Sequence, residues 1–239
     1  MINLILIRHG QSKWNAKNQF TGWVDASLSN VGISEAKLAG LLIKDLNIDI
    51  SFSYTSFLKR ASDTLSIILN IIDSKNMLVT KAWELNERHY GSLTGLNKAE
   101  TKNKLGDDLF NIYRRSWDIA PPALDEKSNY INSFSSLNKD IPKENIPLTE
   151  SLKDTFNRVI PYYKKKILPQ IMSGKKILIS AHGNSLRALC KDIFNINNDK
   201  INMLEIPTGN PLCIVFKNDL KNVKNAFYLD DKRKKEIVL

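Results

Sequence analysis

The chain has 239 residues, 42% of them hydrophobic and 25% charged, which suits one α/β domain with a sizeable buried core. The opening apolar stretch is too short for a signal peptide, and no later run is long enough to span a bilayer. Cys190 and Cys213 have no CxxC spacing, so neither a disulfide framework nor a zinc site is indicated. We therefore expect a soluble, cytoplasmic protein with no membrane partner.

The net charge of +10 fits either a polyanionic partner or a cationic surface around a small anionic substrate. Lysines make up 27 of the 35 basic residues and are spread along the chain, whereas there are only eight arginines. No basic stripe interleaved with aromatic residues is visible, so we favour a solvated basic surface over nucleic-acid binding. The basic run at 232–235 is expected to belong to a frayed, flexible tail, residues 230–239.

Apolar runs of strand length alternate with segments of helical periodicity. The run INLILI at 2–7 is continuously apolar, which is typical of a strand buried on both faces. Further strands are expected at 51–56, 78–83 and 175–181, with edge strands at 211–217 and 226–229. Helices are expected over 29–45, 58–72, 152–171 and from about 186, with Pro161 and Pro169 bending or breaking the third.

This alternation predicts an α/β fold made of a single domain over residues 1–239. We expect a three-layer sandwich, with a mostly parallel central sheet and helices on both of its faces. Residues from about 91 to 150 depart from the alternation, because a charged helical piece is followed by a stretch rich in Pro, Asn and Ser. We interpret them as a helical and loop insertion that forms a lid, not as a second domain.

One local pattern occurs twice. The segments LILIRHGQS (4–12) and LISAHGNS (178–185) each lead from a buried strand into His-Gly, a polar residue and Ser. Ligands of parallel α/β sheets lie at the carboxyl ends of the strands, so His9 and His182 would converge if their strands are neighbours. One such histidine alone would be interpreted as a residue at a strand end whose imidazole makes structural hydrogen bonds. Two of them together favour a functional site.

A neutral imidazole attacks phosphorus readily, and arginine stabilises the charge that spreads over the phosphoryl oxygens. Five of the eight arginines lie in or beside candidate motifs: Arg8, Arg60, Arg88, Arg114 and Arg115. Taken singly, Arg60 is better read as an exposed first-turn residue, and Arg114 with Arg115 as a solvated helix face. Glu87 is the candidate proton donor and acceptor, although a surface salt bridge with Arg88 is an equal alternative. Because no metal or nucleotide motif is visible, we expect no metal.

These residues resemble the bisphosphoglycerate-dependent phosphoglycerate mutases of the histidine phosphatase superfamily, over about residues 4 to 229. Arg8-His9-Gly10 alone would indicate only the superfamily. The resemblance to the narrower family rests on longer motifs in this order: FTGW (20–23), NERHYG (86–91), GLNKAET (95–101), AHGNSLRAL (181–189) and IPTGNPL (206–212).

The resemblance implies interconversion of 3-phosphoglycerate and 2-phosphoglycerate in glycolysis and gluconeogenesis, with 2,3-bisphosphoglycerate as primer and no metal. His9 would carry the phosphoryl group, Glu87 would exchange the proton, and His182, Arg8 and Arg60 would stabilise the transferring group. The implied substrate-binding residues are Arg8, Ser12, Asn15, Thr21, Gly22, Arg60, Glu87, Arg88, Tyr90, Lys98, Arg114, Arg115, Gly183 and Asn184. The lid would exclude water, and the protein would form a homo-oligomer, a dimer or tetramer.

Three alternatives stay open at this point. A phosphatase on the same fold would transfer the phosphoryl group to water, a silent binding protein would only sense phosphorylated metabolites, and a nucleic-acid binder would use the surface charge. The sequence also departs from the family at Gln11, Lys13 and the segment 124–141, which leaves the lid as the least defined part of the prediction.

Overall fold

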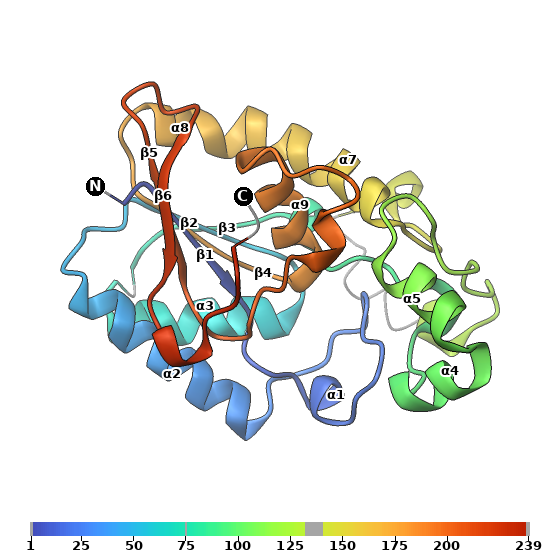
Figure 1. Ribbon diagram of the computed structural model, residues 1–239. Helices are drawn as coiled ribbons and strands as arrows, with labels where there is room; N and C mark the ends of the chain where they lie inside the picture. Colours follow the sequence, from blue (N-terminus) through green and yellow to red (C-terminus); the bar gives the residue numbers. More distant parts are fainter. Residues whose placement is uncertain (1, 75, 132–140, 238–239) are drawn as a thin grey trace.

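The computed structural model describes residues 2–74, 76–131 and 141–237, and a six-stranded sheet runs through the centre of this part of the chain (Figure 1). Its order is β3-β2-β4-β1-β5-β6. The strands are β1 (Leu4–Arg8), β2 (Phe52–Thr55), β3 (Val79–Lys81), β4 (Ile177–Ala181), β5 (Leu212–Phe216) and β6 (Val223–Tyr228). The first four are mutually parallel, whereas β5 is antiparallel to β1 and β6 is antiparallel to β5. The predicted mostly parallel sheet is therefore confirmed.

Helices cover both faces of the sheet, as predicted. On one face, α2 (Asn30–Asp45) packs against α3 (Lys59–Ile71), and both contact the strand side chains Ile5 and Ile7. On the other face, α7 (Leu152–Tyr162) and α9 (Gly183–Ile193) pack over Leu4 and Leu6. Successive residues of a strand point to opposite faces, so one apolar run supplies both cores. Figure 1 shows α2 and α3 below the sheet and α7, α8 and α9 above it.

Two sequence-based expectations about elements need correction. The strand β5 was expected at an edge, but it lies between β1 and β6, and four of its five residues are buried. Its continuously apolar sequence LCIVF is that of an interior strand. The helix expected to bend or break at its prolines does not break: a π-helical turn (Tyr163–Ile167) joins α7 to α8 (Leu168–Met172), so the segment stays helical from 152 to 172. Neither Pro161 nor Pro169 can donate a backbone hydrogen bond, and the wider π-helical turn lies between them.

The predicted insertion contains α4 (Lys98–Leu105) and α5 (Asp107–Arg115), together with short 3-10 helices at Gly91–Leu93 and Lys143–Asn145. A small apolar cluster of Phe20, Leu93 and Phe110 joins this region to the segment that includes α1 (Lys13–Ala16). Residues 132–140 of the expected lid lie outside the described residues. In the described part of the chain, every helix is too short or too polar to cross a membrane.

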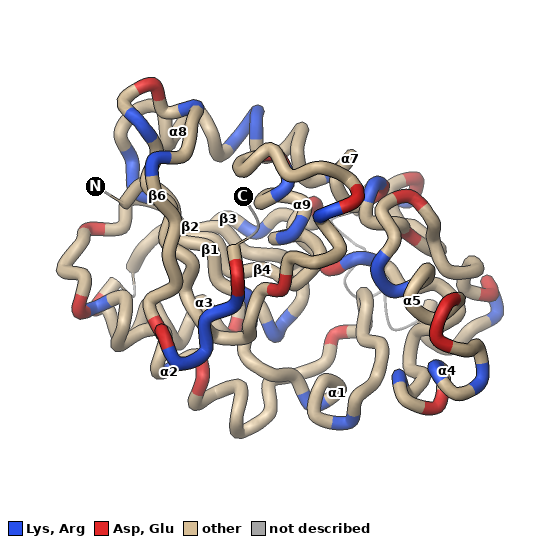
Figure 2. Tube along the Cα trace, viewed as in Figure 1, with Lys and Arg blue, Asp and Glu red and all other residues tan. Residues whose placement is uncertain are grey.

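The first part of the C-terminal tail is bound to the body of the protein. A 3-10 turn at Asp231–Arg233 follows β6. Its Arg233 donates hydrogen bonds to Asp230 Oδ2 (2.6 Å) and to the carbonyl oxygens of Thr208 and Gly209 (3.2 and 3.3 Å). A frayed tail would not make these contacts, so the expectation needs correction at Arg233. Elsewhere the lysines and arginines are dispersed along the whole trace, as Figure 2 shows.

Candidate active site

The two histidines meet at the carboxyl ends of neighbouring strands. Strands β1 and β4 pair in parallel with Arg8 opposite Ala181, so His9 and His182 follow at the same edge of the sheet. Their ring centroids are 4.9 Å apart, and both side chains are buried. The predicted convergence is confirmed.

Hydrogen bonds define which nitrogen of His9 carries its proton. Nδ1 lies 2.7 Å from the carbonyl oxygen of Gly10, which only accepts, so Nδ1 is the protonated nitrogen. Nε2 is then the nitrogen with the lone pair, and it accepts a hydrogen bond from Arg60 Nε at 3.2 Å. Burial, together with the charges of Arg60 and Arg8, lowers the pKa of His9 well below 6.5. The ring is therefore neutral near pH 7, and its unprotonated nitrogen, Nε2, is the one in contact with Arg60.

Arg60 is fully enclosed, which contradicts its reading as an exposed residue. Its guanidinium donates to the carbonyl oxygens of Val24 and Gly22, both at 2.8 Å, in addition to His9. Burial lowers its pKa to about 10, so it keeps its charge at neutral pH. The adjacent Lys59 is exposed instead, because neighbouring residues of a helix point in different directions.

The second histidine is held by a residue that was given no role from the sequence. Ser56 Oγ lies 2.7 Å from His182 Nε2, at the end of β2. Burial, followed by the charges of Arg60 and His9, lowers the pKa of His182 well below 6.5. His182 is therefore a neutral hydrogen-bonding group beside His9.

Glu87 is buried and does not form the surface salt bridge that was considered. Its Oε1 accepts hydrogen bonds from the backbone N–H groups of Arg88 (2.8 Å) and Asn184 (3.1 Å). The guanidinium of Arg88 turns the other way and donates to the carbonyl oxygens of Tyr113 and Arg114 at the end of α5. Glu87 is thus fixed by main-chain donors while its second oxygen borders the site.

Two neighbouring cavities, which share four bordering residues, lie beside these groups. An inner cavity of about 40 Å³ is bordered by the predicted residues His9, Asn15, Thr21, Gly22 and Arg60. An outer cavity of about 350 Å³ is bordered by the predicted residues Arg114, Arg115, Gly183 and Asn184. Four predicted residues border both: Arg8, Glu87, Tyr90 and Lys98. A molecule that fills both cavities would therefore pass Glu87.

Three predicted residues border neither cavity. Ser12 is buried and caps α1 by accepting a hydrogen bond from the backbone of Asn15. Arg88 lies beneath the ring of Tyr90, with its guanidinium carbon 4.7 Å from the ring centroid, and His182 lies behind His9. Their contacts are those of residues that support the site wall.

Sequence reasoning missed several residues that border the cavities. Gln19 lies on the inner one, and Arg187, Glu205, Thr208 and Lys235 lie on the outer one. Arg187 and Thr208 belong to the motifs AHGNSLRAL and IPTGNPL, which indicated the family but assigned no role to these two residues. Glu205 and Lys235 lie in none of the motifs, so nothing in the sequence indicated that they border the cavity.

The outer cavity is strongly cationic. Burial and then the neighbouring charge of Arg115 lower the pKa values of Arg114 and of Arg187, the latter to about 10. Burial is also the main cause of the lowered pKa of Lys98. Crowded, partly desolvated cations raise the free energy of the empty site, and an entering anion offsets that cost.

A buried ion pair behind the site holds the segment that carries Glu87. Arg158 Nε lies 2.6 Å from Glu150 Oε1, and Arg158 also donates to the carbonyl oxygens of Glu84, Asn86 and Glu87. Glu150 Oε2 accepts the backbone N–H of His89 at 2.7 Å. The whole turn from 84 to 89 is thus anchored to α7.

Comparisons with known proteins agree with this geometry. The model of the histidine phosphatase superfamily (branch 1) matches residues 4–131. The chain is 52% identical to a protein of Pelagibacter ubique, over all of both chains, and 49% identical to one of Treponema denticola, over 98% of this chain and 94% of the relative. Both relatives are named 2,3-bisphosphoglycerate-dependent phosphoglycerate mutase.

Among solved structures, the fold is similar to that of mycobacterial glucosyl-3-phosphoglycerate phosphatase. The TM-score is 0.70 with 18% sequence identity, over 95% of this chain and 97% of that one. At this identity the likeness concerns the fold alone.

Proposed function

Because this chain belongs to the histidine phosphatase superfamily and, within it, to the 2,3-bisphosphoglycerate-dependent phosphoglycerate mutases, we propose that it interconverts 3-phosphoglycerate and 2-phosphoglycerate. The observation that carries the mechanism is the position of Glu87, a buried carboxylate at the junction of the cavity that holds His9 and the cationic outer cavity. A nucleophile and a proton carrier that face one space support group transfer better than simple binding.

In the first step, the lone pair of His9 Nε2 attacks the phosphorus of one phosphoryl group of 2,3-bisphosphoglycerate. The bond from that phosphorus to the glycerate oxygen breaks, and the oxygen takes the proton of the carboxylic acid form of Glu87, which leaves Glu87 as a carboxylate. Arg8, Arg60 and His182 stabilise the charge on the transferring phosphoryl oxygens. A monophosphoglycerate and a phosphohistidine result.

In the second step, the other hydroxyl of a monophosphoglycerate attacks the phosphohistidine. Glu87 takes the hydroxyl proton, the bond between nitrogen and phosphorus breaks, and 2,3-bisphosphoglycerate forms again in a new orientation. Repeating the first step from that orientation gives the isomer. The cycle therefore needs the primer only to load His9.

The cations of the outer cavity suit the part of the substrate that does not react. Lys98, Arg114 and Arg115 border that cavity, and bidentate arginine contacts match both carboxylate and phosphate groups. Filling this space would also exclude water, which would otherwise hydrolyse the phosphohistidine. Tyr90 and Asn184, joined by a 3.0 Å hydrogen bond, would orient the glycerate near Glu87.

We also propose that the protein is a cytoplasmic enzyme of glycolysis and gluconeogenesis. It would work without a metal, as a dimer or tetramer. Arginines and neutral histidines supply the stabilisation that a metal ion provides in other phosphoryl transfers. Light scattering of the purified protein would give the oligomeric state.

The decisive experiment follows conversion of 3-phosphoglycerate to 2-phosphoglycerate in EDTA, with and without trace 2,3-bisphosphoglycerate, for the wild type and His9→Ala. We expect activity that requires the primer, survives chelation and is lost in the variant. Phosphate release without isomerisation would identify a phosphatase instead. Absence of both reactions would favour a binding protein.

A further inference from the structure

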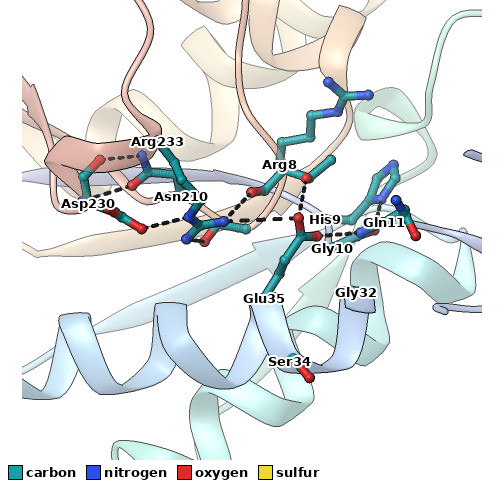
Figure 3. Close-up of polar contacts among 12 residues, drawn as sticks. Arg8, His9, Gly10, Gln11, Gly32, Ser34, Glu35, Asn210, Asp230 and Arg233 are labelled. Atoms are coloured by element: carbon teal, nitrogen blue, oxygen red, sulfur yellow. Dashed lines mark hydrogen bonds and ion pairs between the residues drawn. The ribbon is translucent and has the colours of Figure 1, made fainter. Parts of the chain in front are cut away.

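Glu35 lies outside both cavities, yet it touches two segments that border them. It projects from α2 toward the turn that follows the nucleophile (Figure 3), and its side chain is 19% exposed. Its Oε2 accepts the backbone N–H of Gln11 at 2.7 Å, two residues after His9. Its Oε1 accepts the hydroxyl of Thr208 at 2.7 Å. One carboxylate thus joins the nucleophile turn to the segment 206–209.

The segment 206–209 is itself part of the site. It runs beside the end of β1, where the N–H of Gly209 donates to the carbonyl oxygen of Arg8 at 2.9 Å and Arg8 donates to the carbonyl oxygen of Ile206 at 2.9 Å. Thr208 borders the outer cavity. A shift of this segment relative to His9 would change how the two cavities are aligned.

The packing around Glu35 leaves little room for adjustment. A Cβ on Gly10 would lie 2.2 Å from the carbonyl oxygen of Gly32, and a Cβ on Gly209 would lie 2.5 Å from Glu35 Cβ. The nucleophile turn and the segment 206–209 therefore both lie directly against α2. This close contact limits their distance from the helix. The Glu35 carboxylate is bonded to both of them, in addition to the hydrogen bond from the N–H of Ser29 to the carbonyl oxygen of Gln11.

The tail adds a charge to the same point. Arg233 Nη1 lies 4.0 Å from Glu35 Oε1, and Arg233 also binds the carbonyl oxygens of Thr208 and Gly209. Figure 3 shows Glu35 between the His9 turn on one side and Arg233 on the other. The anchored part of the tail thus supports the Thr208 side of the contact.

We propose that Glu35 is a positioning residue that fixes the turn His9–Gln11 in register with the segment 206–209, and so aligns the nucleophile with the outer cavity. Both hydrogen-bonding partners donate, and the two oxygens of the Glu35 carboxyl group accept one each. The inference rests on the proposed function, because its activity readouts are those of the mutase. Displacing a reacting group by about 1 Å costs on the order of 100-fold in rate. A contact outside the site that positions His9 can therefore change the rate of phosphoryl transfer.

The test uses Glu35→Leu, which removes both hydrogen bonds, and Glu35→Gln, whose amide oxygen accepts from Gln11 while its NH₂ group donates to Thr208 Oγ1. Ser34→Ala is the matched control, since Ser34 is the neighbouring residue on the same helix and points away into solvent (Figure 3). For each protein, the rate of His9 phosphorylation by 2,3-bisphosphoglycerate is measured in a single turnover, together with KM for 3-phosphoglycerate.

We expect Glu35→Leu to lower the phosphorylation rate about 10- to 100-fold, with KM changed by less than about threefold. Glu35→Gln should recover most of the rate, and Ser34→Ala should match the wild type. An equal rate in the wild type and folded Glu35→Leu would overturn the proposal, as would a loss explained by the unfolded fraction. If Glu35→Leu does not fold, Thr208→Val decides, because it removes a single hydrogen bond and is expected to lower the same rate.

A second readout does not depend on any substrate. The amide proton of Gln11 in an NMR spectrum should move upfield in Glu35→Leu, because its hydrogen bond to a carboxylate is lost, and should stay in place in Ser34→Ala. An unmoved signal in Glu35→Leu would contradict the contact itself. A wild type with no primer-dependent isomerisation would instead refute the proposed function, while the Gln11 signal would still report on Glu35.

Discussion

Arg60 Nε donates to His9 Nε2 across 3.2 Å, so the nitrogen proposed to attack phosphorus is already in contact with a cation that would stabilise the product. Two other donors of the same guanidinium are held by the carbonyl oxygens of Gly22 and Val24. The guanidinium therefore cannot rotate freely, and it presents Nε to His9. A fixed donor of this kind needs no reorganisation when charge develops.

Arg60→Lys should lower the rate of His9 phosphorylation by about 100-fold or more, because an ammonium group cannot reproduce the three contacts. The carbonyl oxygens left unpaired should also cost roughly 1–3 kcal/mol of unfolding free energy. Single-turnover phosphorylation and urea unfolding measure the two effects. Lys59→Ala is the control, as the neighbouring basic residue is exposed; similar losses in both variants would contradict the role of Arg60.

Stability should fall as pH is lowered below 6.5. Burial lowers the pKa of His89 to about 4, and those of His9 and His182 well below 6.5, so the folded protein keeps all three rings neutral. The unfolded chain takes up protons below 6.5 that the folded chain does not, and stability present above 6.5 is lost toward the folded pKa values. Each histidine contributes a slope of about 1.4 kcal/mol per pH unit in this window.

Urea unfolding between pH 7.5 and 5.5 tests this dependence, because this range spans the ordinary histidine pKa of 6.5. A steady decrease in unfolding free energy that begins near pH 6.5 is expected. A flat profile would mean that the histidines are not buried in neutral form.

Three arginines show which features of the site can be predicted from the sequence and which cannot. Arg8 was placed correctly because it ends a recognisable strand. Arg60 was read as exposed when taken alone, because the sequence shows that it lies in a first helical turn but not which way that turn faces. Arg158 received no role, because its partner Glu150 and the carbonyl groups that it binds are brought to it only by the fold.

The other site residues divide in the same way, into those that lie in local motifs and those that only the fold brings together. Short sequence motifs were enough to predict His9, His182 and Glu87 as site residues, since each lies in a motif at a strand end or turn. The contacts of Ser56 with His182 and of Glu35 with Thr208 join segments more than 120 residues apart, and no local pattern encodes them. The strand order, which places β5 inside the sheet, is a property of long-range pairing as well.

Arg158→Leu should destabilise the protein by about 3–5 kcal/mol, because it leaves Glu150 as an uncompensated buried charge. The turn from 84 to 89 would lose its anchor, so activity should fall even where the variant is fully folded. Lys164→Ala removes an exposed ion pair with Asp192 and should change stability by less than about 1 kcal/mol. Chemical unfolding of both variants checks the contrast, and equal effects would show that Arg158 acts only as a surface cation.

Glu205→Gln should lower KM for 3-phosphoglycerate. Glu205 Oε1 lies 3.1 Å from Arg115 Nη2, and its Oε2 lies 3.8 Å from Lys235 Nζ, so a carboxylate of the protein already engages two cations at the edge of the outer cavity. Burial opposes the charge of Glu205, but Arg115 outweighs it and the pKa is lowered, so Glu205 is ionised at neutral pH. An anionic substrate must therefore compete with it for Arg115 and approach against its charge.

Removing that charge should lower KM by a few-fold at low ionic strength, and the difference should shrink as salt screens the interaction over about 10 Å at 0.1 M. Asp45→Asn is the matched control, because it makes the same change of charge at the exposed end of α2. Steady-state kinetics at two salt concentrations distinguish the cases. An unchanged KM in Glu205→Gln would mean that Arg115 is free to bind substrate without displacing Glu205, and an equal change in both variants would assign the effect to net charge alone.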